Sequence, residues 1–134
     1  MLKIAINIPV RDLGSSTRFF SALGFDVSPQ FAGATNMNRI DVSEDVSIML
    51  LTEPQFKAVS RKDLVDATKS AEAIVQLQVE SRRRVDELVD RAFAAGGTPH
   101  HDTNDQNHLY GRSFQDLDGH LWDVFYVQTT LNVR

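Results

Sequence analysis

The pattern of secondary structure in the first half of the chain returns in the second half, and this repeat limits the possible folds most. From Lys3 to Val10, apolar residues alternate with others at the period of two that is typical of a strand. Asp12 offers an N-cap to a helical pattern that ends at Gly24. Three short strands are then predicted, at 26–31, 34–42 and 46–52. The first half therefore predicts a βαβββ order.

The second half repeats this order after a polar segment. Residues 73–79 predict a strand, and apolar residues at helical spacing from Val85 to Phe93 predict a helix that Gly96 and Gly97 end. Further strands are predicted at 108–114 and 121–127, with a weaker one near 98–102. Between the halves, Pro54 is well placed to open a short helix.

We therefore predict a single α+β domain over residues 1–134. Its parts are a first module at about 1–53, a linker at 54–71, a second module at about 72–128 and a tail at 129–134. At this length a chain buries enough surface to fold as one compact unit.

The two modules can be superposed by a shift of 69 residues, which places Ala5, Asn7 and Pro9 on Ile74, Gln76 and Gln78. Because side chains alternate across a strand, these residues point away from the apolar set that the helices should cover. The second face therefore carries amides. A sheet with helices on one side and polar residues on the other is a natural wall for a ligand cleft.

Composition excludes several classes of function. Cysteine is absent, so disulfides, zinc–thiolate sites and thiol nucleophiles are excluded. The net charge of −4 comes with no basic stripe, which disfavours nucleic acid as a partner. No apolar run approaches the ~20 residues of a membrane span, and the chain starts directly on a strand pattern. We expect a cytoplasmic protein without a membrane partner.

Three segments resemble a known superfamily, at residues 7–13, 19–25 and 114–123. In this order they are similar to the vicinal oxygen chelate superfamily of glyoxalases, bleomycin resistance proteins and dioxygenases. The resemblance covers nearly the whole chain. It implies that the βαβββ modules curl into a cup-shaped mixed sheet with helices on the outer face, usually completed in a homodimer. It also implies that the enzymes of the superfamily hold a divalent metal in the cup.

The resemblance further implies four inward strand positions with His or Glu ligands. On this chain they fall on Ala5, at or near Leu50, on Ile74 and on Asp123. Only Asp123 keeps a ligand-type side chain, whereas a catalytic metal normally has at least three protein ligands. We therefore expect no cofactor.

Asp123 is the candidate catalytic residue, as a general base in the cup. The other interpretation is structural support through a hydrogen bond to Asn7, Gln76 or Gln78. Tyr110 and Arg112 share a strand face and could stack on and bind a small acidic or aromatic ligand.

Two further groups of side chains keep open interpretations. Arg112 could instead be tied to Asp116 or Asp118 as a surface ion pair. His100, His101 and His108 lie in one polar stretch with Asp102 and Asp105, which fits either a solvated loop or a metal site. The role of these histidines stays open.

The leading hypothesis is a small-molecule-binding protein that takes a polar-aromatic ligand without the usual metal. The predicted ligand-binding residues are Asn7, Gln76, Gln78, Tyr110, Arg112 and Phe125, together with Asp123. The alternative is a lyase or dioxygenase-like enzyme that depends on a divalent metal such as Zn, Ni, Fe or Mn. A third possibility is an interaction module whose dimer surface is its purpose.

Overall fold

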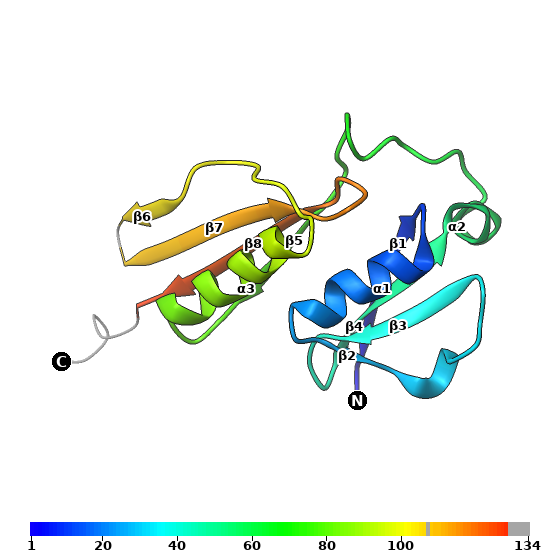
Figure 1. The fold of residues 1–134 in the computed structure, drawn as a ribbon, viewed down its shortest axis with the longest axis horizontal. Helices are drawn as coiled ribbons and strands as arrows, with labels where there is room; N and C mark the ends of the chain where they lie inside the picture. The colour runs from blue at the N-terminus through cyan, green and yellow to red at the C-terminus, as the bar shows by residue number, and fades with distance from the viewer. Residues whose placement is uncertain (107, 129–134) are drawn as a thin grey trace. The chain divides into compact units, whose positions relative to one another are not determined.

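The chain forms two compact units, Met1–Asp66 and Ala67–Arg134, shown in Figure 1. The computed structural model describes residues 1–106 and 108–128, so the predicted tail at 129–134 lies outside the described residues. Each unit holds a four-stranded mixed sheet, and the α+β class and the repeated βαβββ order are confirmed. No helix in the described part of the chain is long and apolar enough to cross a membrane.

The first unit has the strand order β1-β4-β3-β2. Its elements are β1 (Ile4–Val10), α1 (Leu13–Ala22), β2 (Asp26–Val27), the 3₁₀ turn η1 (Pro29–Phe31), β3 (Met37–Asp41), β4 (Val46–Thr52) and α2 (Glu53–Ser60). β1 and β4 are parallel, and the other pairs are antiparallel. Asp12 caps α1 as predicted, because its Oδ1 accepts a hydrogen bond of 2.9 Å from the Ser15 amide.

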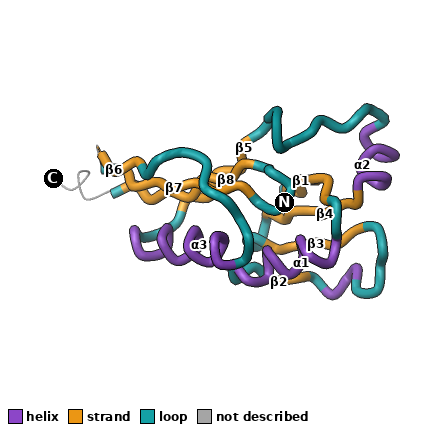
Figure 2. Tube along the Cα trace, turned by 45° about the horizontal axis from the view of Figure 1, so that its top comes forward, coloured by secondary structure: helices purple, strands orange, loops and turns teal. Residues whose placement is uncertain are grey.

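The second unit repeats this arrangement with the strand order β5-β8-β7-β6. Its elements are β5 (Ile74–Gln78), α3 (Arg82–Ala94), β6 (Asn104–Gln106), β7 (Leu109–Gln115) and β8 (Leu121–Val127). β5 and β8 are parallel, and Ser81 caps α3 by accepting a hydrogen bond from the Arg84 amide. Figure 2 shows α3 on one side of its sheet, which leaves the other side of β5, β8 and β7 without a helix of this unit.

Alternation along the strands separates a buried face from an open one in both units. Ile8 and Val10 are buried in the first unit, and Trp122 and Val124 are completely buried in the second. The Phe114 ring stacks on Trp122 at 5.9 Å between ring centroids. Apolar side chains of α3 close this core: Val85, Leu88, Val89 and Ala92. Burial of such apolar surface is the main stabilising term of the fold.

Three of the predicted strands differ from the observed ones. The strand expected at 26–31 ends at Val27, because η1 begins at Pro29, which has no amide hydrogen for a ladder bond. The strand expected at 34–42 is confined to Met37–Asp41. The weak strand expected near 98–102 is wrong. Thr98 makes only an isolated bridge with Gln115, and the strand of that region is β6.

A buried carboxylate holds the turn between β7 and β8. Asp116 Oδ1 accepts hydrogen bonds from the amides of Asp118 and His120, both at 3.0 Å, and Oδ2 accepts one from the Trp122 indole, also at 3.0 Å. Burial raises the pKa of the Asp116 carboxyl, and the neighbouring His120 and these hydrogen bonds oppose the rise. Gly119 completes the turn with a φ of 90°. The Asp116 carboxylate therefore fixes the turn that follows β7 and joins it to the buried Trp122 indole of β8.

Replacing Asp116 with alanine is expected to destabilise the second unit by roughly 2 to 3 kcal/mol, because three donors, two of them buried, lose their acceptor. Trp122 is the single tryptophan of the chain, so its fluorescence during urea unfolding reports on this unit. Asp63→Ala is the control, since Asp63 makes an exposed ion pair of 3.5 Å with Lys57 that should contribute little. An unchanged urea midpoint in Asp116→Ala would contradict this account.

Candidate functional site

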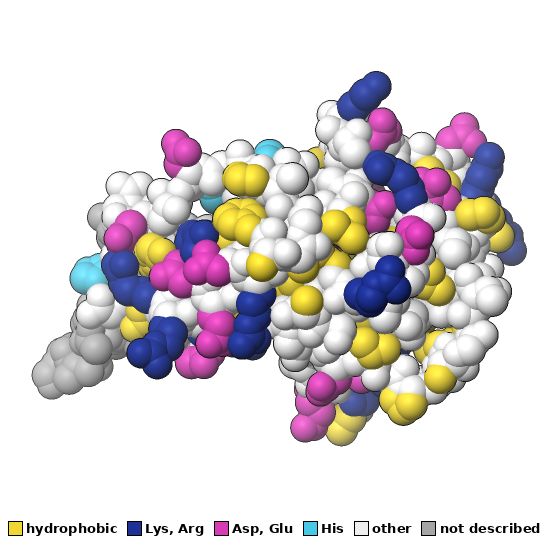
Figure 3. Space-filling model, in the orientation of Figure 1, with side chains coloured by type: hydrophobic (Ala, Val, Ile, Leu, Met, Phe, Trp, Pro, Cys, Tyr) yellow, Lys and Arg dark blue, Asp and Glu magenta, His cyan; other side chains and the backbone are white. Residues whose placement is uncertain are grey.

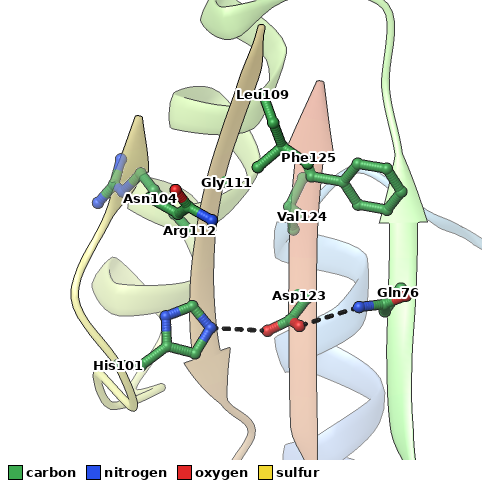
Figure 4. A pocket seen from close by; sticks show the side chains of 9 residues that line it. All are labelled: Gln76, His101, Asn104, Leu109, Gly111, Arg112, Asp123, Val124 and Phe125. Carbon is green, nitrogen blue, oxygen red and sulfur yellow. Dashed lines mark hydrogen bonds and ion pairs between the residues drawn. The ribbon is translucent and has the colours of Figure 1, made fainter. Parts of the chain in front are cut away.

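The open face of the second unit contains a pocket of about 280 Å³, shown in Figure 4. Strands β5, β8 and β7 form its floor, and the segment from His101 to β6 forms one side. The residues that line it are Gln76, His101, Asn104, Leu109, Gly111, Arg112, Asp123, Val124 and Phe125. The pocket lies on the face opposite α3, where the sequence predicted a cleft wall.

Hydrogen-bonding groups are concentrated at one end of the pocket. Asp123 Oδ2 accepts a hydrogen bond of 3.2 Å from the Gln76 side-chain amide. Asp123 Oδ1 lies 3.1 Å from Nε2 of His101. β5 and β8 run in parallel with Gln76 beside Asp123, so the first contact follows directly from the strand register. Figure 4 shows the three side chains meeting at this end.

His101 is held in place by its backbone and by both ring nitrogens. Its amide donates to Oγ of the buried Ser113 at 3.1 Å, and its Nδ1 lies 2.8 Å from the carbonyl oxygen of Asp102. Each ring nitrogen therefore faces an acceptor, and only the imidazolium can donate to both. The Asp102 carbonyl, and next the Asp123 carboxylate, raise the pKa of His101 above its ordinary 6.5, although partial burial opposes this.

The opposite end of the pocket is apolar. Leu109 and Phe125 are half-buried there, and Gly111 lies between them on β7 with no side chain. Gly111 pairs with Phe125 on one side and with Asn104 on the other. The pocket is thus amphipathic, with the Asp123 carboxylate, the His101 imidazole and the Gln76 amide at one end and mainly carbon surface at the other.

The pocket lining contains four of the residues predicted for the site, although one of them, Arg112, turns its guanidinium to the other face of the sheet. Gln76, Asp123 and Phe125 line the pocket, and the expected hydrogen bond between Gln76 and Asp123 is present. Gln78 lies beside Phe125 on the same face, outside the lining. Asn7 belongs to the first unit, where it lies exposed on β1 beside Met49. Whether these residues bind a ligand stays a prediction.

Tyr110 and Arg112 share a face, but it is the face that packs against α3. The Tyr110 hydroxyl donates to Asp86 at 2.6 Å, and Arg112 pairs with Asp86 at 2.8 Å and with Asp90 at 3.0 Å. The partners predicted for Arg112, which were Asp116 and Asp118, are therefore wrong. Figure 3 shows basic and acidic side chains intermixed over α3. The guanidinium of Arg112 is engaged there, although the residue also contributes to the pocket lining.

Five residues of the pocket were not predicted from the sequence: His101, Asn104, Leu109, Gly111 and Val124. His101 was placed in a polar stretch of undecided role, because nothing in its spacing relates a loop residue to Asp123, 22 positions later. Asn104, Leu109 and Gly111 carried no signal by themselves. Alternation from Asp123 and Phe125 across the antiparallel pair β7–β8 would have found Gly111, had the register been known.

Comparison with known families identifies the fold. The model of the Glyoxalase/Bleomycin resistance protein/Dioxygenase superfamily matches residues 4–124. The chain belongs to this superfamily. A comparison with curated proteins finds no match.

Solved structures agree with this assignment. A hypothetical protein, SA1046, from S. aureus is 28% identical to this chain, with 94% of each chain covered and a TM-score of 0.80. A glyoxalase/bleomycin resistance protein/dioxygenase family enzyme from Burkholderia phytofirmans PsJN is 17% identical, with coverage of 92% of this chain and 97% of that one and a TM-score of 0.76. Lactoylglutathione lyase from Agrobacterium tumefaciens is 12% identical, with coverage of 92% and 91% and a TM-score of 0.66. The last two likenesses show the fold alone.

The residues of this chain do not fit the divalent metal that enzymes of the superfamily hold. Ala5 and Ile74 lie on strand faces opposite the cores, and neither side chain can bind a metal ion. Leu50, expected near a ligand position, instead pairs with Ile8 and is completely buried. Asp123 and His101 are one adjacent pair, but the described residues contain no group of three or more His, Asp or Glu side chains that could hold a metal.

The Asp102 carbonyl and, after it, the Asp123 carboxylate raise the pKa of His101, so Asp123→Asn should lower this pKa by removing the second contribution. NMR titration of the four imidazoles in the parent protein and in Asp123→Asn measures the pKa of His101 in each. Because the folded pKa is raised, the contact stabilises fully below pH 6.5, and its contribution is lost as the pH rises through the folded pKa. If His101 titrates identically in the variant, the contact does not form in solution.

Proposed function

We propose that this chain binds a small polar organic molecule in the pocket of its second unit and needs no metal to do so. The observation that carries the proposal is the amphipathic pocket, in which Gln76, Asp123 and His101 converge at one end and Leu109 and Phe125 line the other. Ligand sites typically combine apolar walls with a few convergent polar groups that fix orientation.

The polar end has capacity for a ligand. The Asp123 side chain is 23% exposed, and its carboxylate accepts from Gln76 and lies within hydrogen-bond distance of His101. A carboxylate has about four acceptor positions, so a donor group of a ligand can join these two contacts. A hydroxyl or an amine would satisfy Asp123, whereas a second carboxylate would be repelled by it.

This chemistry changes the expected ligand. Arg112 was predicted to bind an acidic ligand, but its guanidinium pairs with Asp86 and Asp90 on the α3 side. Those two carboxylates already neutralise the arginine. An acidic ligand therefore gains little from Arg112, and a ligand that donates hydrogen bonds is favoured.

Binding of 2-naphthalenemethanol, a neutral donor with an apolar body, is expected to exceed that of 2-naphthoate, which accepts only. Asp123→Asn should weaken the alcohol by about 1 kcal/mol, or roughly fivefold in Kd, because a neutral amide oxygen replaces the charged acceptor of the hydroxyl. Isothermal titration calorimetry measures both comparisons.

Asp45→Asn is the matched control, since Asp45 lies in the first unit in an exposed contact of 3.6 Å with Lys3. It should bind the alcohol as the parent protein does. No binding of either probe, or equal loss of affinity in both variants, would argue against this pocket as the binding site.

The metal-dependent lyase or dioxygenase-like alternative has its own measurement. Protein grown with Fe, Mn, Ni and Zn is expected to carry far less than one metal ion per chain by plasma mass spectrometry, because the ligand set of the described residues is incomplete. A stoichiometric metal that is lost in Asp123→Ala would instead favour the enzyme. Homodimer formation and a cytoplasmic location also stay predictions, and light scattering tests the first.

A further inference from the structure

Gly111 occupies a strand position where glycine is unfavourable. It lies in the middle of β7, buried, with Phe125 beside it on β8 and Asn104 beside it on β6. Glycine in a strand interior weakens the strand and often marks a place where a ligand or another backbone approaches closely. Its position in the pocket lining makes a ligand the relevant case.

Neither the backbone nor the packing requires glycine at this position. Four glycines of the described chain have a positive φ, namely Gly24, Gly33, Gly96 and Gly119, and Gly111 is not among them. A Cβ added to Gly111 would lie 3.5 Å from Cβ of Phe125, 3.6 Å from Cδ2 of Leu109 and 3.7 Å from the Val124 carbonyl oxygen. These are ordinary van der Waals distances, so alanine fits without displacing a neighbour.

Gly119 shows what a required glycine looks like in the same unit. Its φ is 90°, and an added Cβ would lie 2.9 Å from the carbonyl oxygen of Ala67. Any other residue there is strained in its backbone and meets main-chain atoms. Unlike Gly119, Gly111 is not required by the backbone or by packing, which indicates a role in the pocket rather than in the fold.

We propose that Gly111 determines ligand specificity by leaving a flat slot in the pocket floor that admits an aromatic ring. The ring would lie over the bare backbone of Gly111 and against the side chain of Phe125. Leu109 borders the slot on the same strand face. A flat ring is the shape that makes contact with both an exposed peptide plane and an aromatic side chain.

The strand geometry sets where the polar group of this ligand must be. Asp123 and Phe125 are two residues apart on the same face of β8, which corresponds to roughly 7 Å along the strand. A ligand whose ring lies beside Phe125 therefore reaches Asp123 with a hydroxyl or amine attached through a short arm. The ligand class is therefore an aromatic alcohol or amine. This inference rests on the proposed function.

The test compares Gly111→Ala, Gly111→Val and Gly119→Ala with the parent protein. Without ligand, Gly111→Ala should unfold at the same or a higher temperature than the parent, because alanine restricts the unfolded chain and fits the strand. Gly119→Ala should unfold at a lower temperature. Calorimetry should show that Gly111→Val weakens 2-naphthalenemethanol by roughly tenfold or more, with a smaller loss in Gly111→Ala.

The outcomes separate the two proposals. A clear loss of thermal stability in Gly111→Ala would show that this glycine is structural and would overturn the inference. Unchanged affinity for the alcohol in both Gly111 variants would also overturn it, while leaving the proposed function intact. The parent protein should prefer 2-naphthalenemethanol to the thicker saturated decahydronaphthalenemethanol, and equal affinity would refute the flat slot. If the parent binds neither alcohol, the proposed function itself fails.

Discussion

The alternation of side chains across a strand is the constraint on which this structure depends. In β8 it sends Trp122 and Val124 into the core under α3 and sends Asp123 and Phe125 to the opposite side. A shift of one residue would bury the carboxylate and expose the indole. The same rule that builds the core therefore builds the pocket, and a change of register along these strands would alter both together.

The hydrogen bonds and ion pairs between α3 and β7 explain why the pocket receives no free guanidinium group from Arg112. Arg112 and Tyr110 both bond to Asp86, and the Arg82 guanidinium lies 4.7 Å from the centre of the Tyr110 ring. Arg82 also donates to Asp105 on β6 at 3.1 Å, which ties the pocket side that carries Asn104 to the helix. Hydrogen bonds from Tyr110 and Arg112 hold the pKa of Asp86 below its usual value, although burial acts in the other direction. The guanidinium groups of Arg82 and Arg112 are thus engaged on the α3 side of the sheet.

The sequence predicted the elements whose signals are local or periodic. The repeated strand–helix order, the Asp12 cap and the shared face of Gln76 and Asp123 all follow from spacing. The orientation of Tyr110 and Arg112 was also available, because both share their parity on β7 with Phe114, which is completely buried. Assigning them to the cleft overlooked that neighbour.

Other features depend on tertiary contacts that spacing does not encode. His101 reaches Asp123 only because a loop returns over the sheet and its amide bonds to Ser113. β6 forms where that loop pairs with β7, and not at the Thr98 region, where strand propensity suggested it. The depth of the pocket at Gly111 results from the lack of a side chain there, and the apolar periodicity of the sequence gives no signal for this.

The strand order has a consequence for the moment at which each unit is completed during synthesis. In the first unit the central strand β4 ends at Thr52, so all strands of this sheet leave the ribosome before those of the second unit. In the second unit β8 lies between β5 and β7, yet it is the last described strand to leave the ribosome. Until then β5 and β7 have no common neighbour, and α3 lacks the contact with Trp122 and Val124 of β8 that completes its core. The sheet of the second unit therefore cannot assemble before β8 is available, since β8 is the strand that joins β5 to β7.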